Sequence, residues 1–413
     1  MTATEKRNDG KCRRAVIWVA VLLSVLPSCR RLAAQDPYRE RAIRLLRSVP
    51  LIDGHNDILY ANRQHLHHDT VVDIARDQPL LHTDIPRLRA GGVGAQFWAA
   101  YVPSKNIHTG THPAVFALEL IENVHRFCRR YPQTFAAATT AADIERNFRA
   151  GKISCLIGIE GGHAIENSLG ALRAFAELGV RYMTLTHSES LDWAVSSNDS
   201  TRTGGLTPFG EEVVREMNRL GMLVDISHVN DATMMDVLRV TRAPVIYSHS
   251  SARTLSGHRR NVPDSILGRV GANGGIVMVN FNPAFISEEV RAFNDRNRRY
   301  FRDDLHLDST AVDDSVDAWE QRPGAPRATL KQVADHIEHI RQIAGVDHVG
   351  LGSDFDGIDT VPEGLEDVSK FPDLIAELLR RGWSEPDIKK VVGLNALRVM
   401  RAVERVSVLQ PMP

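Results

Sequence analysis

The sequence lacks an excess of charge of either sign. Its 413 residues carry 50 basic and 51 acidic side chains, for a formal net charge of −1 at pH 7. A protein that binds nucleic acid or a strongly anionic partner needs a basic surface to neutralise that partner. The balance therefore argues against a nucleic-acid footprint and predicts a small substrate, since no extended charged surface has to be explained.

The sequence also lacks an apolar run long enough to cross a bilayer, which takes about 20 residues. The apolar stretch 15–26 follows several basic residues and precedes the small-residue segment 32–34. This order of charged, apolar and small residues is typical of a secretory signal. We therefore expect residues 1–34 to be a cleaved signal peptide and the mature protein to be exported, as a periplasmic or extracellular bacterial enzyme.

Two features of this leader leave alternatives open. Arg30 and Arg31 directly after the apolar run are unusual in cleaved signals, so the segment could instead be retained as a short anchor. A lipid on Cys29 is the other alternative, although Pro27 makes the resemblance to a lipoprotein signal poor. In both cases membrane attachment would run through the N-terminus alone.

Cysteine is scarce, with four residues in the chain. Cys12 and Cys29 lie in the predicted leader, which leaves Cys128 and Cys155 in the mature protein. An oxidising compartment would permit a bridge between these two. Because Cys155 falls in a predicted buried strand and Cys128 in a predicted helix, we expect two buried free thiols instead.

Eight short apolar runs, separated by helical stretches, make up much of the sequence. Strands that are buried on both faces of a parallel sheet need not alternate apolar and polar residues. Eight such strands predict a closed (β/α)8 TIM-like barrel, in which the active site lies at the C-terminal ends of the strands. With 43% hydrophobic residues, residues 35–413 can form one such domain. The runs cover residues 49–57, 94–99, 153–160, 182–187, 222–228, 244–249, 275–280 and 348–354.

The sequence also predicts helices between these runs. Apolar residues recur at helical spacing in residues 114–130, 169–178, 208–220, 330–344 and 371–381, most of them closed by Pro or Gly. Residues 287–327 differ, because they carry many charges and few apolar side chains. We expect this segment to be a lid or a solvent-exposed insertion between strands seven and eight.

Most of the apolar runs stop at a residue that can bind a metal. His55 and Asp57 lie two apart, so both side chains project from the same side of a strand. Alone this pair could equally be turn residues or a hydrogen-bonded pair, but Glu160, His228 and His249 occupy equivalent strand ends. Because five ligands exceed what one tetrahedral zinc uses, we expect two Zn²⁺ ions bridged by Glu160 and a water or hydroxide.

Other polar strand ends suggest catalytic roles. His187 could stabilise an oxyanion, or it could simply bond a neighbouring hydroxyl. Asp354 is placed to move a proton, whereas Asp356, which precedes a glycine, fits a turn better. Arg260 offers a fork for a substrate carboxylate, although paired arginines such as Arg259 and Arg260 are more often solvated.

At these residues the chain resembles the membrane (renal) dipeptidase family of zinc-dependent barrel hydrolases. The motifs appear in the family's order and lie within about residues 40 to 405. They are found at residues 53–57, 158–163, 185–188, 248–252, 259–264, 277–281, 352–357 and 361–370.

The resemblance implies a zinc dipeptidase that tolerates a D-residue at the C-terminal position of the dipeptide, with some members opening β-lactams. It also implies a homodimer. One departure is Phe285, which replaces a substrate-contacting tyrosine. The resemblance assigns metal roles to His55, Asp57, Glu160, His228 and His249, a catalytic role to Asp354, and substrate roles to His187 and Arg260.

Two other functions compete with this one. A related binuclear hydrolase of β-lactams, lactones or other small amides and esters would use the same ions. Those enzymes more often begin with His-x-His and bridge their metals with a modified lysine, whereas this chain has His55, Asp57 and Glu160. A binding protein that has lost catalysis would usually lack a ligand, and all five are present.

Overall fold

The computed structural model describes residues 36–66, 72–107 and 112–408. The predicted signal peptide, its cleavage site and Cys29 lie outside the described residues. No helix within the described ranges combines the length and the hydropathy that a membrane span requires.

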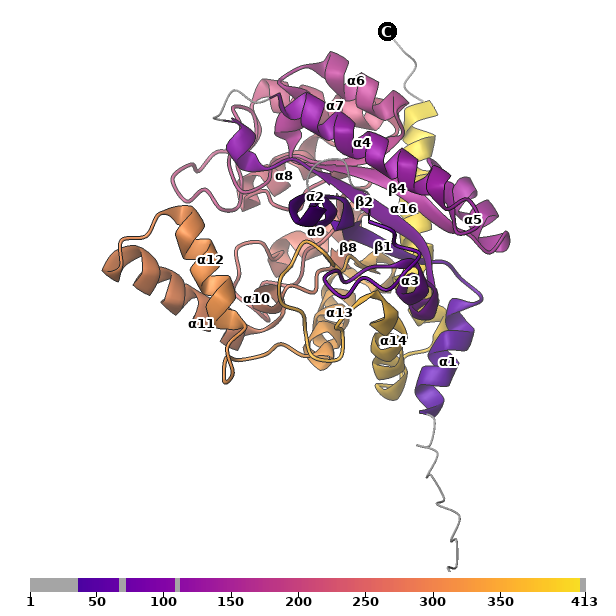
Figure 1. Ribbon diagram of the computed structural model, residues 1–413. Coiled ribbons are helices and arrows are strands. Elements are labelled where there is room, and N and C mark those ends of the chain that lie inside the picture. The colour runs from indigo at the N-terminus through magenta and orange to yellow at the C-terminus, as the bar shows by residue number, and fades with distance from the viewer. Residues whose placement is uncertain (1–35, 67–71, 108–111, 409–413) are drawn as a thin grey trace, which may run out of the picture. The chain divides into compact units, whose positions relative to one another are not determined.

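Eight parallel strands form a closed barrel, which confirms the predicted fold (Figure 1). Each strand pairs with its neighbour, and β1 closes the ring by pairing with both β2 and β9. The strands are β1 (Leu51–Asn56), β2 (Val93–Tyr101), β4 (Ile153–Glu160), β5 (Val180–Thr184), β6 (Leu223–Asp225), β7 (Ile246–Tyr247), β8 (Ile276–Val279) and β9 (Val349–Leu351).

One further strand was not expected. β3 (Phe135–Ala137) pairs with the first residues of β4, on the side where β5 pairs with the later residues. A segment of three residues is too short to show a strand pattern in sequence. β3 extends the sheet but is not one of the eight strands that close the barrel.

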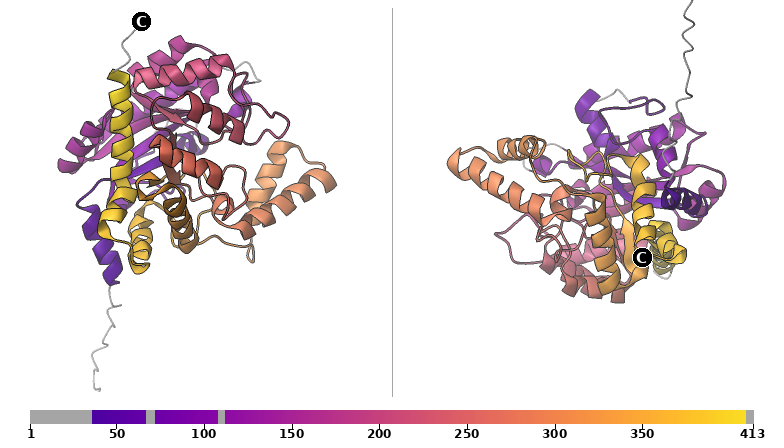
Figure 2. Two further views of the ribbon diagram at one scale, coloured as in Figure 1. Left: turned by 180° about the vertical axis from the view of Figure 1, so that it is seen from behind. Right: turned by 90° about the horizontal axis from the view of Figure 1, so that it is seen from below.

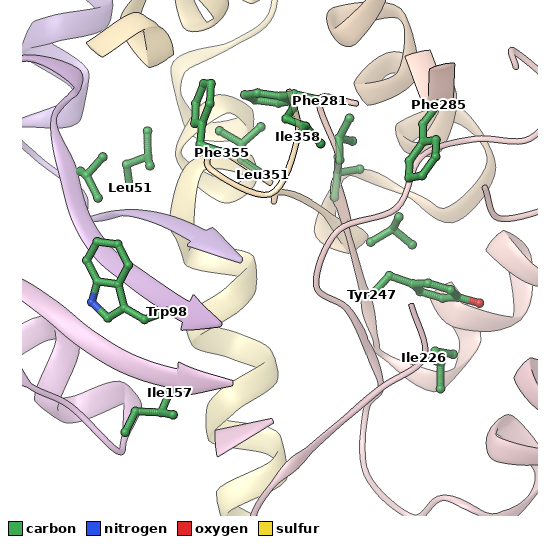
Figure 3. Packing of buried hydrophobic residues seen from close by; sticks show 14 of the residues in the cluster. Leu51, Trp98, Ile157, Ile226, Tyr247, Phe281, Phe285, Leu351, Phe355 and Ile358 are labelled. Carbon is green, nitrogen blue, oxygen red and sulfur yellow. The ribbon is translucent and has the colours of Figure 1, made fainter. Parts of the chain in front are cut away.

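Alternate residues of each strand supply two cores. Leu51 and Trp98 pack outward against the helices, whereas Ile52 and Phe97 belong to a second cluster with Tyr182 in the barrel interior. Figure 3 shows Leu51 and Trp98 on neighbouring strands of this outer layer. Burial on both faces explains why the strands read as continuous apolar runs.

Sixteen α-helices surround this barrel in the described residues. The five that the apolar spacing predicted are α4 (Pro113–Arg130), α6 (Leu169–Glu177), α7 (Pro208–Leu220), α13 (Leu330–Ala344) and α14 (Phe371–Arg380). The others are α1 (Pro37–Leu46), α2 (Ile58–Leu66), α3 (Ile85–Gly91), α5 (Ala141–Arg149), α8 (Asp231–Val240), α9 (Asp264–Asn273), α10 (Pro283–Ile286), α11 (Glu288–Arg299), α12 (Ser309–Glu320), α15 (Glu385–Lys389) and α16 (Asn395–Val408).

The insertion between the last two barrel strands is a helical hairpin of α11 and α12. Its two helices stand away from the barrel in both views of Figure 2. A small cluster of Phe301, Val312 and Val316 holds the hairpin together. Within the hairpin, the carboxylate of the buried Glu320 accepts a hydrogen bond of 3.1 Å from Asn294 Nδ2 of α11. The same carboxylate links the hairpin to the rest of the domain by accepting a bond of 2.7 Å from Thr360 Oγ1, and Glu288 of α11 does so by accepting a bond of 2.8 Å from the Gly257 backbone N–H.

The expectation of two free thiols was wrong, because Cys128 of α4 and Cys155 of β4 form a disulfide with a Cα–Cα distance of 6.7 Å. Both residues lie where the sequence placed them, in a helix and in a buried strand. Helix α4 packs across the outer face of β4. The packing of this helix on this strand therefore brings the two sulfurs together, whereas we expected two separate buried thiols.

Removing this disulfide tests its contribution to stability. The bond closes a loop of 27 residues, so the variant with both Cys128→Ala and Cys155→Ala should lose about 3 to 4 kcal/mol of unfolding free energy. Denaturant unfolding of the variant measures this loss. The reduced wild-type protein is the control and should unfold with the variant, whereas equal midpoints for oxidised wild type and variant would contradict the assignment.

Candidate metal centre

The five predicted metal ligands meet at one rim of the barrel. His55 lies near the end of β1, and Glu160 is the last residue of β4. Asp57, His228 and His249 follow β1, β6 and β7 within three residues. Because all barrel strands run in the same direction, their C-terminal ends lie on one face. Residues nearly two hundred positions apart in the chain therefore share one site.

The Glu160 carboxylate occupies the middle of this cluster. Its Oε1 atom lies 3.0 Å from His228 Nε2 and 3.3 Å from His249 Nε2. Its Oε2 atom lies 3.4 Å from His55 Nε2, which in turn is 3.1 Å from Asp57 Oδ2. The two oxygens thus face two different groups of ligand atoms, as a bridging carboxylate would.

The chemistry of this cluster suits bound cations. His55 Nε2 and Asp57 Oδ1 are buried without a hydrogen-bond partner among the described residues. Burial lowers the pKa of His55, but Tyr182, Asp57 and Glu160 outweigh burial and raise that pKa well above its ordinary value. The surroundings of His55 thus favour positive charge, whereas burial lowers the pKa values of His228 and His249 well below their ordinary value and keeps these rings neutral. Neutral imidazoles and carboxylates are the nitrogen and oxygen donors that divalent metals such as zinc use.

Outer contacts orient the ligands, and sequence reasoning assigned no role to the residues that make them. Tyr182 reaches across the barrel so that its hydroxyl lies 2.8 Å from His55 Nδ1. The absence of a side chain at Gly158 makes room for it, because a Cβ there would lie 2.0 Å from the tyrosine ring. His249 Nδ1 lies 2.8 Å from the hydroxyl of Ser248. Only the position of Ser248 beside His249 could have suggested such a role.

A cavity of about 320 Å³ opens above the cluster. The predicted residues His187, Arg260 and Asp354 all line it, together with four of the candidate ligands, Asp57, Glu160, His228 and His249. The wall residues that the sequence did not single out are Tyr60, Tyr101, Asn282, Ile358 and Asp359. Their chain positions carry no recognisable motif, and only the folding of the strand-end loops collects them.

His187 combines the two interpretations that its sequence position allowed. Its Nδ1 atom lies 2.9 Å from Ser188 Oγ and 3.3 Å from Ser104 Oγ. Its Nε2 atom faces the cluster, 3.7 Å from Glu160 Oε1. Burial lowers the pKa of His187 to about 4. The imidazole is therefore neutral near pH 7, with serine hydroxyls on one nitrogen and the cavity on the other.

Arg260 is buried, with 3% of its surface exposed, so the solvated alternative is wrong for this residue. It makes two long hydrogen bonds, of 3.4 Å to Ser250 Oγ and 3.3 Å to the His249 carbonyl. The guanidinium lies over the Phe285 ring, 5.4 Å from its centroid. No carboxylate among the described residues pairs with it, which leaves a buried cation at the cavity wall. Arg259, by contrast, is exposed.

Asp354 and Asp356 differ in their surroundings. Asp354 lies on the cavity with Oδ1 4.0 Å from His55 Nε2, while its Oδ2 accepts a hydrogen bond of 2.9 Å from Asn280 Nδ2. Burial raises the pKa of Asp354 to about 7. The Asp356 carboxylate instead accepts a bond of 2.6 Å from the His82 backbone N–H. The turn interpretation therefore suits Asp356, and Asp354 remains the candidate proton carrier.

Comparisons with known proteins identify the family of this chain. The sequence model of the membrane dipeptidase family (peptidase family M19) matches residues 39–412. Dipeptidase verJ of Clonostachys rogersoniana is 40% identical over 390 residues, which cover 92% of this chain and 91% of that protein.

Solved structures share the fold over most of the chain. A metallo peptidase from Rhodobacter sphaeroides, liganded with a phosphinate mimic of the dipeptide L-Ala-D-Ala, is 26% identical with a TM-score of 0.71, covering 86% of this chain and 99% of that one. A probable dipeptidase from Pseudomonas aeruginosa is 23% identical with a TM-score of 0.78, covering 89% of this chain and 99% of its own, and has the same fold.

The bridging position of Glu160 can be tested by metal analysis. Glu160→Gln removes a negative charge that faces both groups of ligand atoms, so the variant should bind less metal than wild type and lose turnover. Elemental analysis of the purified protein measures the ions per chain. Glu177→Gln, the same change at an exposed position on α6, is the control. Full metal content and full activity in Glu160→Gln would show that Glu160 bridges nothing.

Proposed function

The chain belongs to the membrane dipeptidase family and is a metal-dependent dipeptidase, and we propose that it uses two zinc ions to cleave dipeptides, including those with a C-terminal D-residue. The observation that carries the two-ion proposal is the Glu160 carboxylate, with His228 and His249 facing one oxygen and His55 facing the other. The ligand of the Rhodobacter sphaeroides relative is a phosphinate mimic of L-Ala-D-Ala, a dipeptide with a C-terminal D-residue, which supports the substrate class.

The donor set divides naturally between two ions. His55, Asp57 and Glu160 would hold one, and Glu160, His228 and His249 would hold the other. When bound, such a pair supplies Lewis acidity that polarises a carbonyl and makes water a better nucleophile near neutral pH. The remaining steps belong to side chains of the cavity wall.

Asp354 is the group that moves the proton. Its Oδ2 is held by Asn280, which leaves Oδ1 free to accept a proton from the attacking water. As the carbon–nitrogen bond breaks, the same oxygen returns that proton to the leaving amine nitrogen. A carboxyl with a raised pKa holds a proton long enough to return it near neutral pH.

His187 and Arg260 position the substrate. With Nδ1 accepting from the Ser188 hydroxyl, the neutral His187 imidazole carries its proton on Nε2 and can donate it to the carbonyl oxygen as negative charge develops there. Arg260 binds the free C-terminal carboxylate of the dipeptide through its guanidinium fork. Phe285 supports this guanidinium by stacking and adds no hydrogen bond of its own.

The location of the enzyme is part of the proposal. Disulfides persist in oxidising compartments, so the Cys128–Cys155 bond supports export to the periplasm or the cell exterior after cleavage of residues 1–34. Membrane attachment, if any, would run through the N-terminus. Family membership is the ground for proposing a homodimer. N-terminal sequencing and light scattering of the mature protein test these two points.

Asp354→Asn separates proton transfer from metal binding. The asparagine cannot accept the proton, so the chemical step should slow by roughly 10²-fold or more. Metal content should stay at the wild-type level, because Asp354 is assigned to the water and not to an ion. Single-turnover kinetics and elemental analysis on one preparation measure both. Loss of metal with unchanged turnover per loaded site would mean that Asp354 is a ligand.

Arg260→Ala tests recognition of the carboxylate. A charge-assisted fork contributes on the order of 1.5 to 3 kcal/mol, so kcat/KM for a dipeptide should fall by about 10-fold to 150-fold. The matching dipeptide amide has no carboxylate and should be a poor substrate for both proteins. Arg259→Ala, at the exposed neighbour, should change neither rate. Equal losses on dipeptide and amide would exclude carboxylate binding by Arg260 and favour a hydrolase of other small amides or esters.

A further inference from the structure

A buried carboxylate lies behind the metal centre and takes no part in the chemistry described above. Asp225, the last residue of β6, has no exposed surface. Its Oδ1 atom accepts hydrogen bonds of 3.0 Å from the backbone N–H groups of Ser227 and Ser248. Its Oδ2 atom accepts from Thr184 Oγ1 at 2.5 Å and from Ser248 Oγ at 2.6 Å. Two backbone N–H groups and two hydroxyl groups therefore all donate to this one carboxylate.

These contacts determine where the Ser248 hydroxyl hydrogen points. A serine hydroxyl has one hydrogen to donate, and Ser248 donates it to Asp225 Oδ2 at 2.6 Å. Toward His249 Nδ1, 2.8 Å away, the Ser248 oxygen can then only accept. The proton of the neutral His249 imidazole must lie on Nδ1, which leaves the lone pair of Nε2 directed at Glu160 and the cluster.

The other two histidines of the cluster have different support. His55 Nδ1 faces the Tyr182 hydroxyl, a neutral group that can either donate or accept. His228 Nδ1 is buried without a hydrogen-bond partner among the described residues. Of the three Nδ1 atoms, only that of His249 is connected to a carboxylate among the described residues, through one intervening hydroxyl.

A second aspartate and serine pair joins two other strands in the same way. Asp53 of β1 accepts hydrogen bonds from the backbone N–H and the hydroxyl of Ser353, at 2.7 Å and 2.6 Å. Ser353 precedes Asp354 as Ser248 precedes His249. Among the described residues, no histidine ring nitrogen lies within hydrogen-bond distance of the Ser353 hydroxyl, which instead lies 3.4 Å from the backbone carbonyl of His55. The two pairs thus make similar contributions to barrel packing, but only the Asp225 pair contacts the ring of a candidate ligand.

We propose that Asp225, acting through the Ser248 hydroxyl, is a positioning residue that holds His249 as the Nδ1–H tautomer and directs Nε2 at a metal ion. The proposal rests on the metal-dependent function proposed above. Such outer partners orient an imidazole and make it a stronger ligand, and their loss typically weakens metal binding by 10-fold to 100-fold.

Zinc retention in two matched variants tests this role. Zinc-loaded wild type, Ser248→Ala and Ser353→Ala are each challenged with a competing chelator of known affinity, and the zinc retained is measured. Ser248→Ala should weaken one of the two binding steps by about 10-fold to 100-fold. Ser353→Ala removes the equivalent hydroxyl from the Asp53–Ser353 pair and should leave the binding of both zinc ions unchanged.

The tautomer of His249 can also be measured directly in the wild-type protein, so this test does not depend on whether a variant folds. Nitrogen-15 NMR of histidine-labelled, zinc-loaded protein should show the His249 proton on Nδ1. A His249 ring without a proton on Nδ1 would overturn the proposal, as would unchanged zinc binding in folded Ser248→Ala or equal losses in the two serine variants. If wild type binds no zinc, the proposed function fails with it. If wild type binds two ions and Ser248→Ala binds them as tightly, the positioning role of Asp225 is contradicted while the proposed function stands.

Discussion

The structure of this site depends on the burial of one carboxylate among imidazoles. Glu160 has 4% of its surface exposed, and an isolated charge at such a depth would be strongly unfavourable. Burial raises the pKa of Glu160, but the surrounding histidines outweigh burial and lower that pKa well below its ordinary value. Bound cations would supply the same positive charge and leave the lone pairs of the rings free to act as ligands, so metal binding and the stability of this rim are linked.

The parallel barrel makes this concentration of polar groups possible. Apolar side chains fill the barrel interior below the rim, as Ile52, Phe97 and Tyr182 do. Above them the strands end, and backbone geometry no longer alternates side chains between two faces. His228 and Asp354 have φ values of 66° and 67°, a left-handed conformation that is unfavourable for residues other than glycine. Both residues line the cavity, and this backbone conformation directs their side chains into it.

The cavity presents different chemistry on its different sides. Arg260 offers a buried cation, His187 a neutral donor and Asp354 a carboxyl whose pKa burial raises to about 7. A dipeptide has a carboxylate, a carbonyl and an amide nitrogen within a few bonds. These three groups are chemically complementary to Arg260, His187 and Asp354 respectively. The α11–α12 hairpin is tied to a loop beside the cavity, because Glu320 accepts a hydrogen bond from Thr360, next to the cavity residue Asp359.

By itself the sequence determined the eight barrel strands, the ends of the main helices and the residues that could bind metal, because buried strands and strand-end ligands leave a local pattern. The tertiary structure alone decided the rest. Cys128 and Cys155 form a bond because α4 crosses β4. Tyr182 of β5 supports His55 from across the barrel, and Asp225 supports His249 from the neighbouring strand β6. Such contacts arise from packing between strands, and no spacing along one segment of sequence records them.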